Sequence, residues 1–287
     1  VKRRSPSAGD LRPDADPAEL ARTFERNGAA AISILVDERF AGSLADLSAA
    51  RAATDLPLLA KGFFRDQGEL LQARIAGADA VLLLLRDLDD ARAHLLLDGG
   101  RALGLDVLVE AHDAEELDRA EALGAEIIGL NARDLGTFAV DRKAQLDLVA
   151  RAPRDRVVVA ESGVLNRAHG AEAELTGADA VLIGSALMRA PDPGAKLGEL
   201  LARPLVKVCG LTREEDVAAG AEAGADLAGF VLANSPRRAA RVLPVPDSML
   251  SVGVFVGVGV LVGVEQAVKL GLEIVDEQEL LRRLGEA

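Results

Sequence analysis

Up to about residue 190, short apolar runs alternate with segments whose apolar residues recur at helical spacing. Seven of these runs are almost continuous in Val, Ile, Leu and Ala, which is typical of parallel strands covered on both faces. We predict these strands at residues 30–36, 56–62, 78–85, 105–111, 126–131, 156–162 and 178–184. An eighth, partial strand is predicted in the opening stretch VKRRSPS.

Local signals also predict where the intervening helices begin and end. Glycine adopts the left-handed C-cap conformation at low cost, and five glycines stand where a helix should end. They are Gly28, Gly77, Gly124, Gly177 and Gly224. Asp66 followed by Glu69 predicts a capping box at a helix start. Gly99 and Gly100 fall inside an expected helix, where each should cost roughly 1 kcal/mol.

The order of these elements predicts the fold class. Alternating strand–helix units predict an α/β fold with a parallel sheet, and eight such units predict a closed (β/α)8 TIM barrel. A doubly wound open sheet is the alternative, but no G-x-G-x-x-G fingerprint follows any of the predicted strands.

Composition and charge narrow the classes of partner. The formal net charge of -13 argues against a nucleic-acid surface, although basic residues could still gather locally around an anionic ligand. A single cysteine excludes an intrachain disulfide and fits a reducing, cytoplasmic location. The charged start is unlike a signal peptide, and the apolar stretch at 251–264 is too short and glycine-rich to span a membrane.

Polar side chains stand where the predicted strands end, which in barrels is the rim that carries the chemistry. They are Lys2, Asp37, Lys61, Glu110, Asn131 with Arg133, Glu161 with Ser162, and Gly184 with Ser185. Any one of them could simply mark where the chain leaves the core. Together they predict a site in which Glu110 and Glu161 face Lys61 and compensate its buried charge.

Two of these strand ends indicate a phosphate ligand. The stretches ESGV and IGSALM each place glycine and serine just before a helix, where backbone N–H groups bind phosphate well. Either stretch alone could be an ordinary tight turn. Because the loops after the last two barrel strands are the usual phosphate site, we predict a cradle of Ser162, Gly163, Gly184 and Ser185.

Taken in order, these stretches resemble indole-3-glycerol phosphate synthase of tryptophan biosynthesis. The matching stretches are VKRRSPSAGDL, AAISILVDERFAGSLADL, LPLLAKGFF, AGADAVLLLL, LDVLVEAHD, IIGLNARDL, VVVAESGV and ADAVLIGSALMRAPDP. From Val206, the stretch VKVCGLTREEDVAAGAEAGADLAGFVLANSPRR resembles the opening of phosphoribosylanthranilate isomerase. The resemblance implies a truncated barrel domain at 1–202, a linker at 203–205 and an incomplete isomerase-like segment at 206–287, as in bifunctional fusions.

The resemblance implies a lyase reaction that closes a ring on 1-(2-carboxyphenylamino)-1-deoxyribulose 5-phosphate, with loss of carbon dioxide and water. It makes Lys61 the acid at the ribulose carbonyl oxygen, Lys2 a second cation and Glu110 the base for dehydration. Glu161 would orient the lysines, and Asn131 would help to hold the substrate. No metal or other cofactor is implied.

The resemblance also implies how the substrate is bound. The planar fork of Arg133 suits the anthranilate carboxylate, and Ser5 belongs to the same binding surface. Phe40 and Phe63 are candidates for an apolar wall against the aromatic ring, with core packing as the alternative. Gly62 stands where the family normally has aspartate.

Two other functions remain open at this stage. One is a phosphate-binding barrel without turnover. The other is a bifunctional enzyme in which Cys209, at the isomerase's base position, acts as a thiolate. Because half a barrel leaves strand edges open, we also expect that the C-terminal segment packs on the first barrel or on a second copy.

Overall fold

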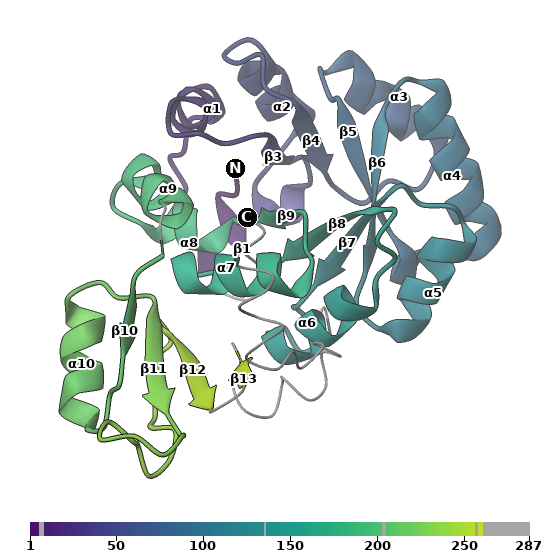
Figure 1. Cartoon of the computed structure of the whole chain (residues 1–287). Coiled ribbons are helices and arrows are strands. Elements are labelled where there is room, and N and C mark those ends of the chain that lie inside the picture. Colours follow the sequence, from purple (N-terminus) through teal and green to yellow (C-terminus); the bar gives the residue numbers. More distant parts are fainter. Residues whose placement is uncertain (6–8, 135, 203–204, 256–257, 261–287) are drawn as a thin grey trace, which may run out of the picture. The chain divides into compact units, whose positions relative to one another are not determined.

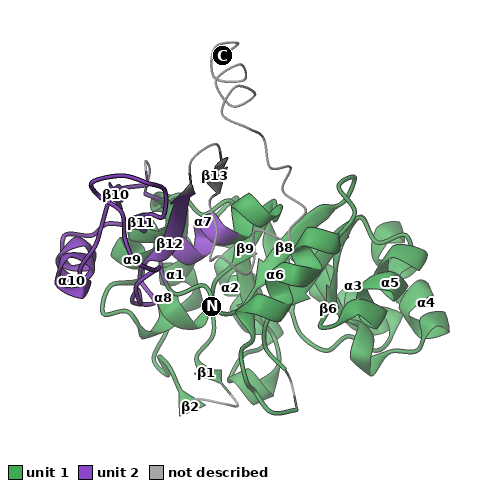
Figure 2. Ribbon diagram, turned by 60° about the horizontal axis from the view of Figure 1, so that its bottom comes forward, with its two compact units in different colours: residues 1–165, 173–201 green, residues 166–172, 202–287 purple. Residues whose placement is uncertain are grey.

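The computed structural model describes residues 1–5, 9–134, 136–202, 205–255 and 258–260. The chain divides into two compact units, which Figure 2 distinguishes by colour. The first unit consists of residues 1–165 and 173–201, and the second of residues 166–172 and 202–287. The part of the expected isomerase-like segment that follows residue 260 lies outside the described residues.

The first unit contains a seven-stranded parallel sheet, in which each strand pairs with its neighbours in chain order. Figure 1 shows that this sheet curls and that helices lie outside it. Its strands are β3 (Ile32–Leu35), β4 (Leu58–Lys61), β5 (Ala80–Leu84), β6 (Asp106–Ala111), β7 (Ile127–Asn131), β8 (Val157–Glu161) and β9 (Ala180–Leu182). All seven lie within the predicted apolar runs, so the α/β class and the parallel order are confirmed.

Helices lie before, between and after the strands of this sheet. They are α1 (Pro17–Arg26), α2 (Leu44–Arg51), α3 (Gln67–Ile75), α4 (Asp90–Ala102), α5 (Ala114–Ala122), α6 (Arg142–Arg151), α7 (Arg167–Thr176), α8 (Ser185–Arg189) and α9 (Pro193–Leu201). In the described part of the chain, the 3-10 turn η1 (Glu38–Phe40) is separated from β3 by two residues, and η2 (Leu85–Asp87) follows β5 directly.

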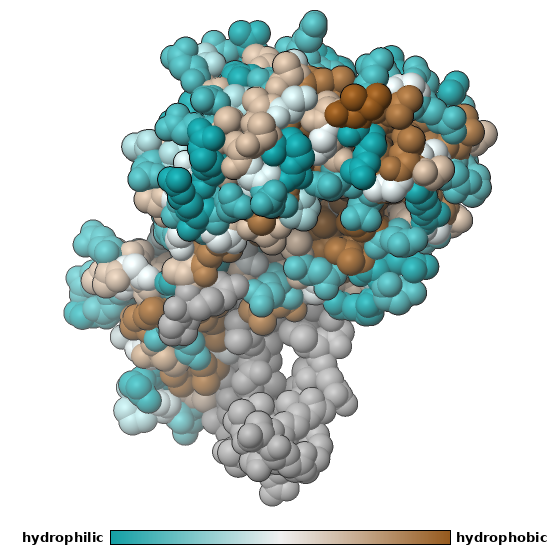
Figure 3. All heavy atoms as spheres, turned by 90° about the horizontal axis from the view of Figure 1, so that it is seen from above, coloured by the Kyte–Doolittle hydropathy of each residue, from teal (hydrophilic) through white to brown (hydrophobic). Residues whose placement is uncertain are grey.

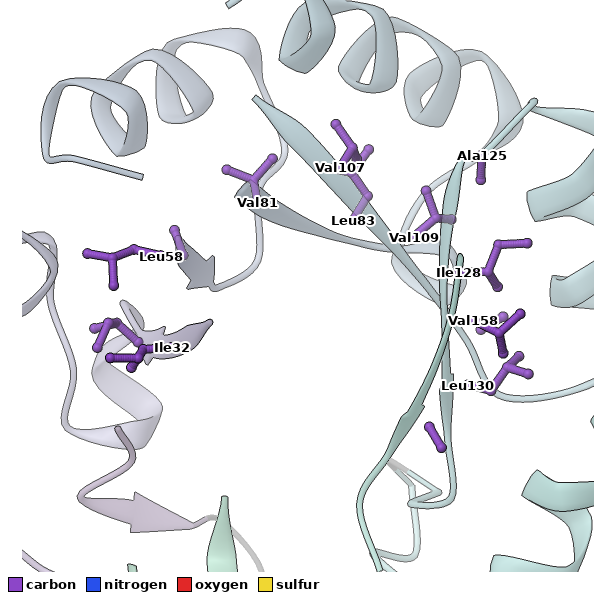
Figure 4. Packing of buried hydrophobic residues seen from close by; sticks show 14 of the residues in the cluster. Ile32, Leu58, Val81, Leu83, Val107, Val109, Ala125, Ile128, Leu130 and Val158 are labelled. Atoms are coloured by element: carbon purple, nitrogen blue, oxygen red, sulfur yellow. The ribbon is translucent and has the colours of Figure 1, made fainter. Parts of the chain in front are cut away.

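The core of the first unit fills the layer between the strands and the helices. Side chains alternate along each strand, so every second one points outward. Figure 4 shows outward side chains of β5 to β8, such as Val81, Val107, Ile128 and Val158, pointing toward the surrounding helices. These residues belong to one buried cluster. The alternate positions, including Lys61, Glu110 and Glu161, therefore face the concave side of the sheet.

The predicted caps are confirmed. Asp66 and Glu69 form a capping box in which each side chain accepts a hydrogen bond from the other residue's backbone N–H. The five predicted C-cap glycines all have φ between 69° and 118°. Gly99 and Gly100 lie inside α4, where an added Cβ would come within 3.0 Å of Gln67 and 2.7 Å of Val107. These two glycines therefore let α4 pack closely on its neighbours.

The strand predicted across VKRRSPS does not form as predicted. Instead, β1 (Arg4–Ser5) pairs antiparallel with β2 (Gly9–Asp10). Arg3 forms a bidentate ion pair with Asp46, at 2.8 Å for both hydrogen bonds. The Arg3 carbonyl accepts the Leu11 N–H, and this turns the chain back on itself. Of residues 1–5, only Val1 lies alongside β3, and its carbonyl accepts the Leu35 N–H at 3.1 Å.

The second unit is a smaller α/β unit with its own four-stranded sheet. Strands β10 (Lys207–Cys209), β11 (Leu227–Val231) and β12 (Leu250–Phe255) are parallel, and β13 (Val258–Val260) pairs antiparallel with β12. Helix α10 (Glu214–Glu222) connects β10 to β11. Arg167 forms a bidentate ion pair with the buried Asp226, which also accepts the Val206 N–H at 2.7 Å.

One face of the molecule is shown in Figure 3, where hydrophilic residues cover most of the described surface and hydrophobic areas are smaller. Among the described residues, the most exposed large apolar side chain is Ile75 on α3, at 77%. No helix in the described part of the chain is long and apolar enough to cross a lipid bilayer.

Candidate active site

Three charged side chains from three different strands meet on the concave side of the sheet. Lys61 at the end of β4 donates to Glu110 Oε2 of β6 at 2.8 Å, and it also donates to Glu161 Oε2 of β8. Glu110 and Glu161 are 3% and 1% exposed, and the Lys61 side chain is 18% exposed. The structure thus brings together the lysine and the two carboxylates that the sequence placed opposite each other.

The charges in this group determine its protonation. Burial alone would lower the pKa of Lys61, but the charges of Glu110 and Glu161 raise it above its ordinary value. Burial alone would raise the pKa of Glu110, but Lys61, His112 and Asn131 hold it below its ordinary range. Burial and the neighbouring Glu110 charge raise the pKa of Glu161. Lys61 is therefore a cation, and any proton shared by the two carboxylates resides on Glu161.

Asn131 from β7 orients Glu110. Its Nδ2 donates to Glu110 Oε1 at 2.9 Å, while its Oδ1 accepts the Arg133 backbone N–H at 2.9 Å. Because the two contacts use opposite ends of the amide, the orientation of Asn131 is determined. In register, Asn131 pairs with Glu161 across the β7–β8 ladder, and Glu110 pairs with Gly129.

Sequence reasoning missed three residues of this group. A Cβ on Gly129 would overlap Glu161 Oε1, so only glycine leaves room for this carboxyl group. His112, just after β6, lies 3.3 Å from Glu110 Oε1 through its Nε2 and 3.1 Å from Glu116 Oε2 through its Nδ1. The order Glu110, His112, Glu116 within EAHDAEE was the available signal, because it puts an imidazole beside a strand-end carboxylate.

Lys2 and Arg133 carry positive charge toward the same rim. Burial, together with the charges of Arg133, Lys61 and Arg189, lowers the pKa of Lys2 to about 8. Burial and Arg189 also lower the pKa of Arg133. Arg189 at the end of α8 was not among the predicted residues. Mutual repulsion of these cations favours an anionic ligand, whose charge would relieve it.

Two of the seven phenylalanines stack beside these cations. The ring centroids of Phe40 and Phe63 lie 6.2 Å apart with nearly parallel planes. Lys2 Nζ lies 5.2 Å from the Phe40 centroid, and the Arg39 guanidinium lies 3.6 Å from the Phe63 centroid. Neither ring is fully buried. They form a partly exposed aromatic surface rather than core packing.

The four residues of the predicted phosphate cradle follow β8 and β9. Ser162 and Gly163 both have left-handed backbone, with φ of 68° and 75°. Gly184 is the N-cap of α8, and Ser185 is its first residue. All four are partly exposed. Ser162 is one of three non-glycine residues with positive φ in the described part of the chain, and such strain is typical of functional loops.

Two other predicted residues lie apart from the Lys61 contacts. Asp37 does not face Lys61, because its carboxylate makes a bidentate ion pair with Arg39 two residues later. Ser5 is buried in β1, where it pairs with Gly9. Gly62 after Lys61 packs against Val36, whose Cγ2 would lie 2.8 Å from an added Cβ.

A hollow of about 680 Å³ lies near the N-terminal ends of β7, β8 and β9, away from Lys61. The residues that line it include Glu126, Arg154, Arg156 and Asp179. It contains none of the predicted site residues. Within the described ranges, no group of three or more His, Cys, Asp or Glu side chains is arranged to hold a metal ion. The free Cys209, at the end of β10 in the second unit, is exposed.

Comparison with known proteins gives a consistent result for the first unit. A family model described as indole-3-glycerol phosphate synthase matches residues 1–200. The indole-3-glycerol phosphate synthase of Nocardioides sp. strain JS614 is 52% identical over 194 residues, which cover 67% of this chain and 75% of that protein. The enzyme of the same name from Leifsonia xyli subsp. xyli is 50% identical over 200 residues, covering 69% and 76% of the two chains.

Solved structures of other proteins share the fold. Thiamine phosphate pyrophosphorylase from Pyrococcus furiosus has a TM-score of 0.51 at 23% identity, covering 67% of this chain and 90% of that one. A mandelate oxidase variant has a TM-score of 0.52 at 19% identity, covering 66% and 67%. At these identities the likeness concerns the fold alone.

Proposed function

The chain belongs to the indole-3-glycerol phosphate synthase family, and we propose that the group around Lys61 is the site at which it carries out the family reaction. The protein is a decarboxylating lyase of tryptophan biosynthesis that acts on a small phosphorylated substrate. The observation that carries the site assignment is the contact of one lysine with two buried carboxylates on the concave side of the sheet.

Ring closure requires an acid at the ribulose carbonyl oxygen, because the aromatic carbon that attacks the carbonyl carbon leaves negative charge on that oxygen. Lys61 is our candidate, since its raised pKa keeps it protonated until the alkoxide develops. As its proton moves to the oxygen, the two carboxylates lose their cation. Glu161, the carboxyl group with the raised pKa, is suited to hold a proton at that stage.

Decarboxylation and dehydration complete the reaction. Loss of carbon dioxide restores the aromatic ring, and loss of water then requires a base that removes a proton and an acid that protonates the leaving hydroxyl group. We assign the base to Glu110, which is held ionised and oriented by Asn131. Lys2, whose pKa of about 8 makes it a better proton donor than an ordinary lysine, is our candidate for the second acid.

Substrate binding is assigned to the rim residues. The aromatic ring would lie against Phe40 and Phe63, and its carboxylate near Arg133. The phosphate would bind at Ser162, Gly163, Gly184 and Ser185, where consecutive left-handed residues and a helix start offer backbone N–H groups. Ser5 would contribute from the N-terminal hairpin.

Replacing Lys61 tests the site assignment. We expect Lys61→Ala to lower kcat by roughly two to four orders of magnitude, the usual worth of a general acid, with little change in affinity for inorganic phosphate. Turnover is measured from the fluorescence of the indole product. The chain has no Trp or Tyr, so this signal has almost no protein background.

Lys143→Ala is the matched control, because Lys143 is an exposed lysine on α6. Lys61→Ala also leaves two buried carboxylates without their cation, so its folding is checked by circular dichroism, and Lys61→Met serves as a second variant. Wild-type turnover in either folded variant would contradict the role of Lys61. Phosphate binding without product from the wild-type protein would instead favour a binding barrel without turnover.

We further propose that the curled sheet closes as a TIM barrel, and that residues 206–287 are the isomerase-like segment. The hydrogen bond from Leu35 to Val1 supports the first proposal, because it sets the N-terminal chain beside β3. The parallel order β10–β11–β12 and the position of Cys209 at a strand end support the second. Self-association through this segment would appear as a dimer in a native mass measurement.

A further inference from the structure

His112 contacts the assigned base, Glu110, but the proposed reaction gives it no role. Its side chain is 9% exposed, and its two ring nitrogens each lie close to a carboxylate oxygen. Nδ1 makes a hydrogen-bond contact with Glu116 Oε2 at 3.1 Å, whereas Nε2 lies 3.3 Å from Glu110 Oε1, within ion-pair distance but without a hydrogen bond. An ionised carboxylate only accepts hydrogen bonds, so a neutral imidazole would turn one lone pair toward negative charge. The geometry is therefore that of an imidazolium held between two carboxylates.

The two buried carboxylates near Lys61 have unequal surroundings. Glu110 has three positive or donor groups nearby: Lys61 from β4, Asn131 from β7 and His112 after β6. Glu161 has Lys61 at Oε2, while its Oε1 is buried without a hydrogen-bond partner among the described residues. Two adjacent buried carboxyl groups resist double ionisation, so these neighbours decide which one keeps the proton.

We propose that His112 is a positioning residue which, as a cation fixed by Glu116, keeps Glu110 rather than Glu161 the ionised member of the buried carboxylate pair. Glu116 anchors the imidazole from α5, where its carboxylate also accepts the His112 backbone N–H at 2.8 Å. This inference rests on the proposed function, because it explains how the base assigned to dehydration stays deprotonated. It is consistent with the raised pKa of His112, about 9, which the flanking carboxylates produce against the effect of burial.

The proposal is tested first by the pH dependence of kcat/KM in His112→Gln. Loss of the cation should raise the pH at which Glu110 ionises, so the acid limb should move upward by roughly one to three pH units. On that limb, a displacement of one pH unit lowers kcat/KM about tenfold at a fixed pH. At high pH, kcat should recover to within about threefold of wild type, which a merely structural defect would not produce.

Two further variants sharpen the comparison. Glu116→Gln keeps an acceptor for the His112 backbone N–H but removes the charge that stabilises the imidazolium, so its acid limb should move in the same direction by a smaller amount. His94→Gln is the control, because His94 on α4 is 62% exposed and pairs only with Asp98, at 3.4 Å, among the described contacts. Its profile should match wild type.

A second readout needs no turnover. The chain has three histidines, so ring carbon-13 labelling resolves them, and the resonance lost in His112→Gln identifies His112. In the wild-type protein this resonance should titrate near pH 9. Titration near the ordinary value of about 6.5, or superimposable pH profiles of His112→Gln and wild type, would overturn the proposal.

Failure of this inference can be told apart from failure of the proposed function. Glu110→Gln at wild-type turnover would remove the base assignment itself, whatever His112 does. An inactive Glu110→Gln together with an unchanged His112→Gln profile would leave the base assignment in place and reject only the role of His112.

Discussion

The geometry of the site requires a residue without a side chain at position 129, which is Gly129. It lies on the concave face of β7, and an added Cβ would overlap Glu161 Oε1 and come within 3.2 Å of Leu108. Glu161 is 1% exposed, so its carboxyl group has little room to move. A glycine in the middle of a strand usually marks such a close approach.

We therefore expect Gly129→Ala to lower stability by about 1–3 kcal/mol through overpacking, and to lower kcat at least tenfold by displacing Glu161 from Lys61. Chemical denaturation followed by circular dichroism and the product fluorescence assay measure the two effects. Gly198→Ala on α9, which has open space at its Cβ, is the control and should be neutral or slightly stabilising. Equal behaviour of the two variants would contradict this account of Gly129.

At the scale of single side chains, the sequence predicted the pairing of opposite charges but missed part of the surroundings. Lys61 in an apolar run implied buried carboxylates, and Glu110 and Glu161 are its partners. Asp37 has the same strand-end position, yet Arg39 binds it locally. His112 was missed because its charge depends on two neighbours, and spacing alone did not show that both would face its ring.

At the scale of elements, α3 shows how much local sequence determines. Asp66 and Glu69 form the predicted capping box, and Gly77 after the helix has φ of 104°. Asp66→Ala removes the side chain that accepts the Glu69 N–H at 3.0 Å. We expect it to cost about 1 kcal/mol of unfolding free energy, the usual worth of an N-cap, without changing KM.

Asp118→Ala provides the comparison for this prediction. Asp118 is 68% exposed on α5, and its ion pair among the described residues is with Arg151 across the surface, at 3.3 Å. Such pairs contribute little, so the loss should be no more than about 0.5 kcal/mol. If Asp66→Ala and Asp118→Ala lowered the unfolding free energy equally in urea denaturation, the N-cap of α3 would stabilise the protein no more than a surface ion pair does.

Elements could be predicted wherever their signals are contiguous in the chain. The seven apolar runs became strands, and the helix ends followed their glycines and capping residues. The prediction failed at VKRRSPS, where the backbone direction depends on distant groups: the ion pair of Arg3 with Asp46 and the hydrogen bond from Leu11 to Arg3. No local pattern predicts such contacts.

At the scale of the whole molecule, the titratable groups of the site predict how stability changes with pH. The folded protein holds a proton on His112 up to about pH 9, whereas an unfolded histidine releases it near 6.5. The contribution of protonated His112 to the unfolding free energy is fully present below pH 6.5 and is lost as the pH rises to about 9. The raised pKa of Glu161 acts in the same direction at lower pH. Two lowered pKa values act in the opposite direction: that of the buried Val1 amino group, about 5 against an ordinary value of 8.0, between those two pH values, and that of Lys2, about 8, above about pH 8.

We therefore expect the unfolding free energy of the wild type, relative to that of His112→Gln, to fall between pH 6.5 and 9, by at most a few kcal/mol, since a tenfold change in proton affinity on folding corresponds to about 1.4 kcal/mol. Urea denaturation followed by circular dichroism at several pH values measures it, because the chain has no Trp or Tyr for fluorescence. The exposed control His94→Gln should show no such pH-dependent difference from the wild type. A difference between wild type and His112→Gln that stays constant over this range would show that His112 is neutral in the folded protein, because a charged imidazole between two carboxylates must lose its stabilising effect as it deprotonates.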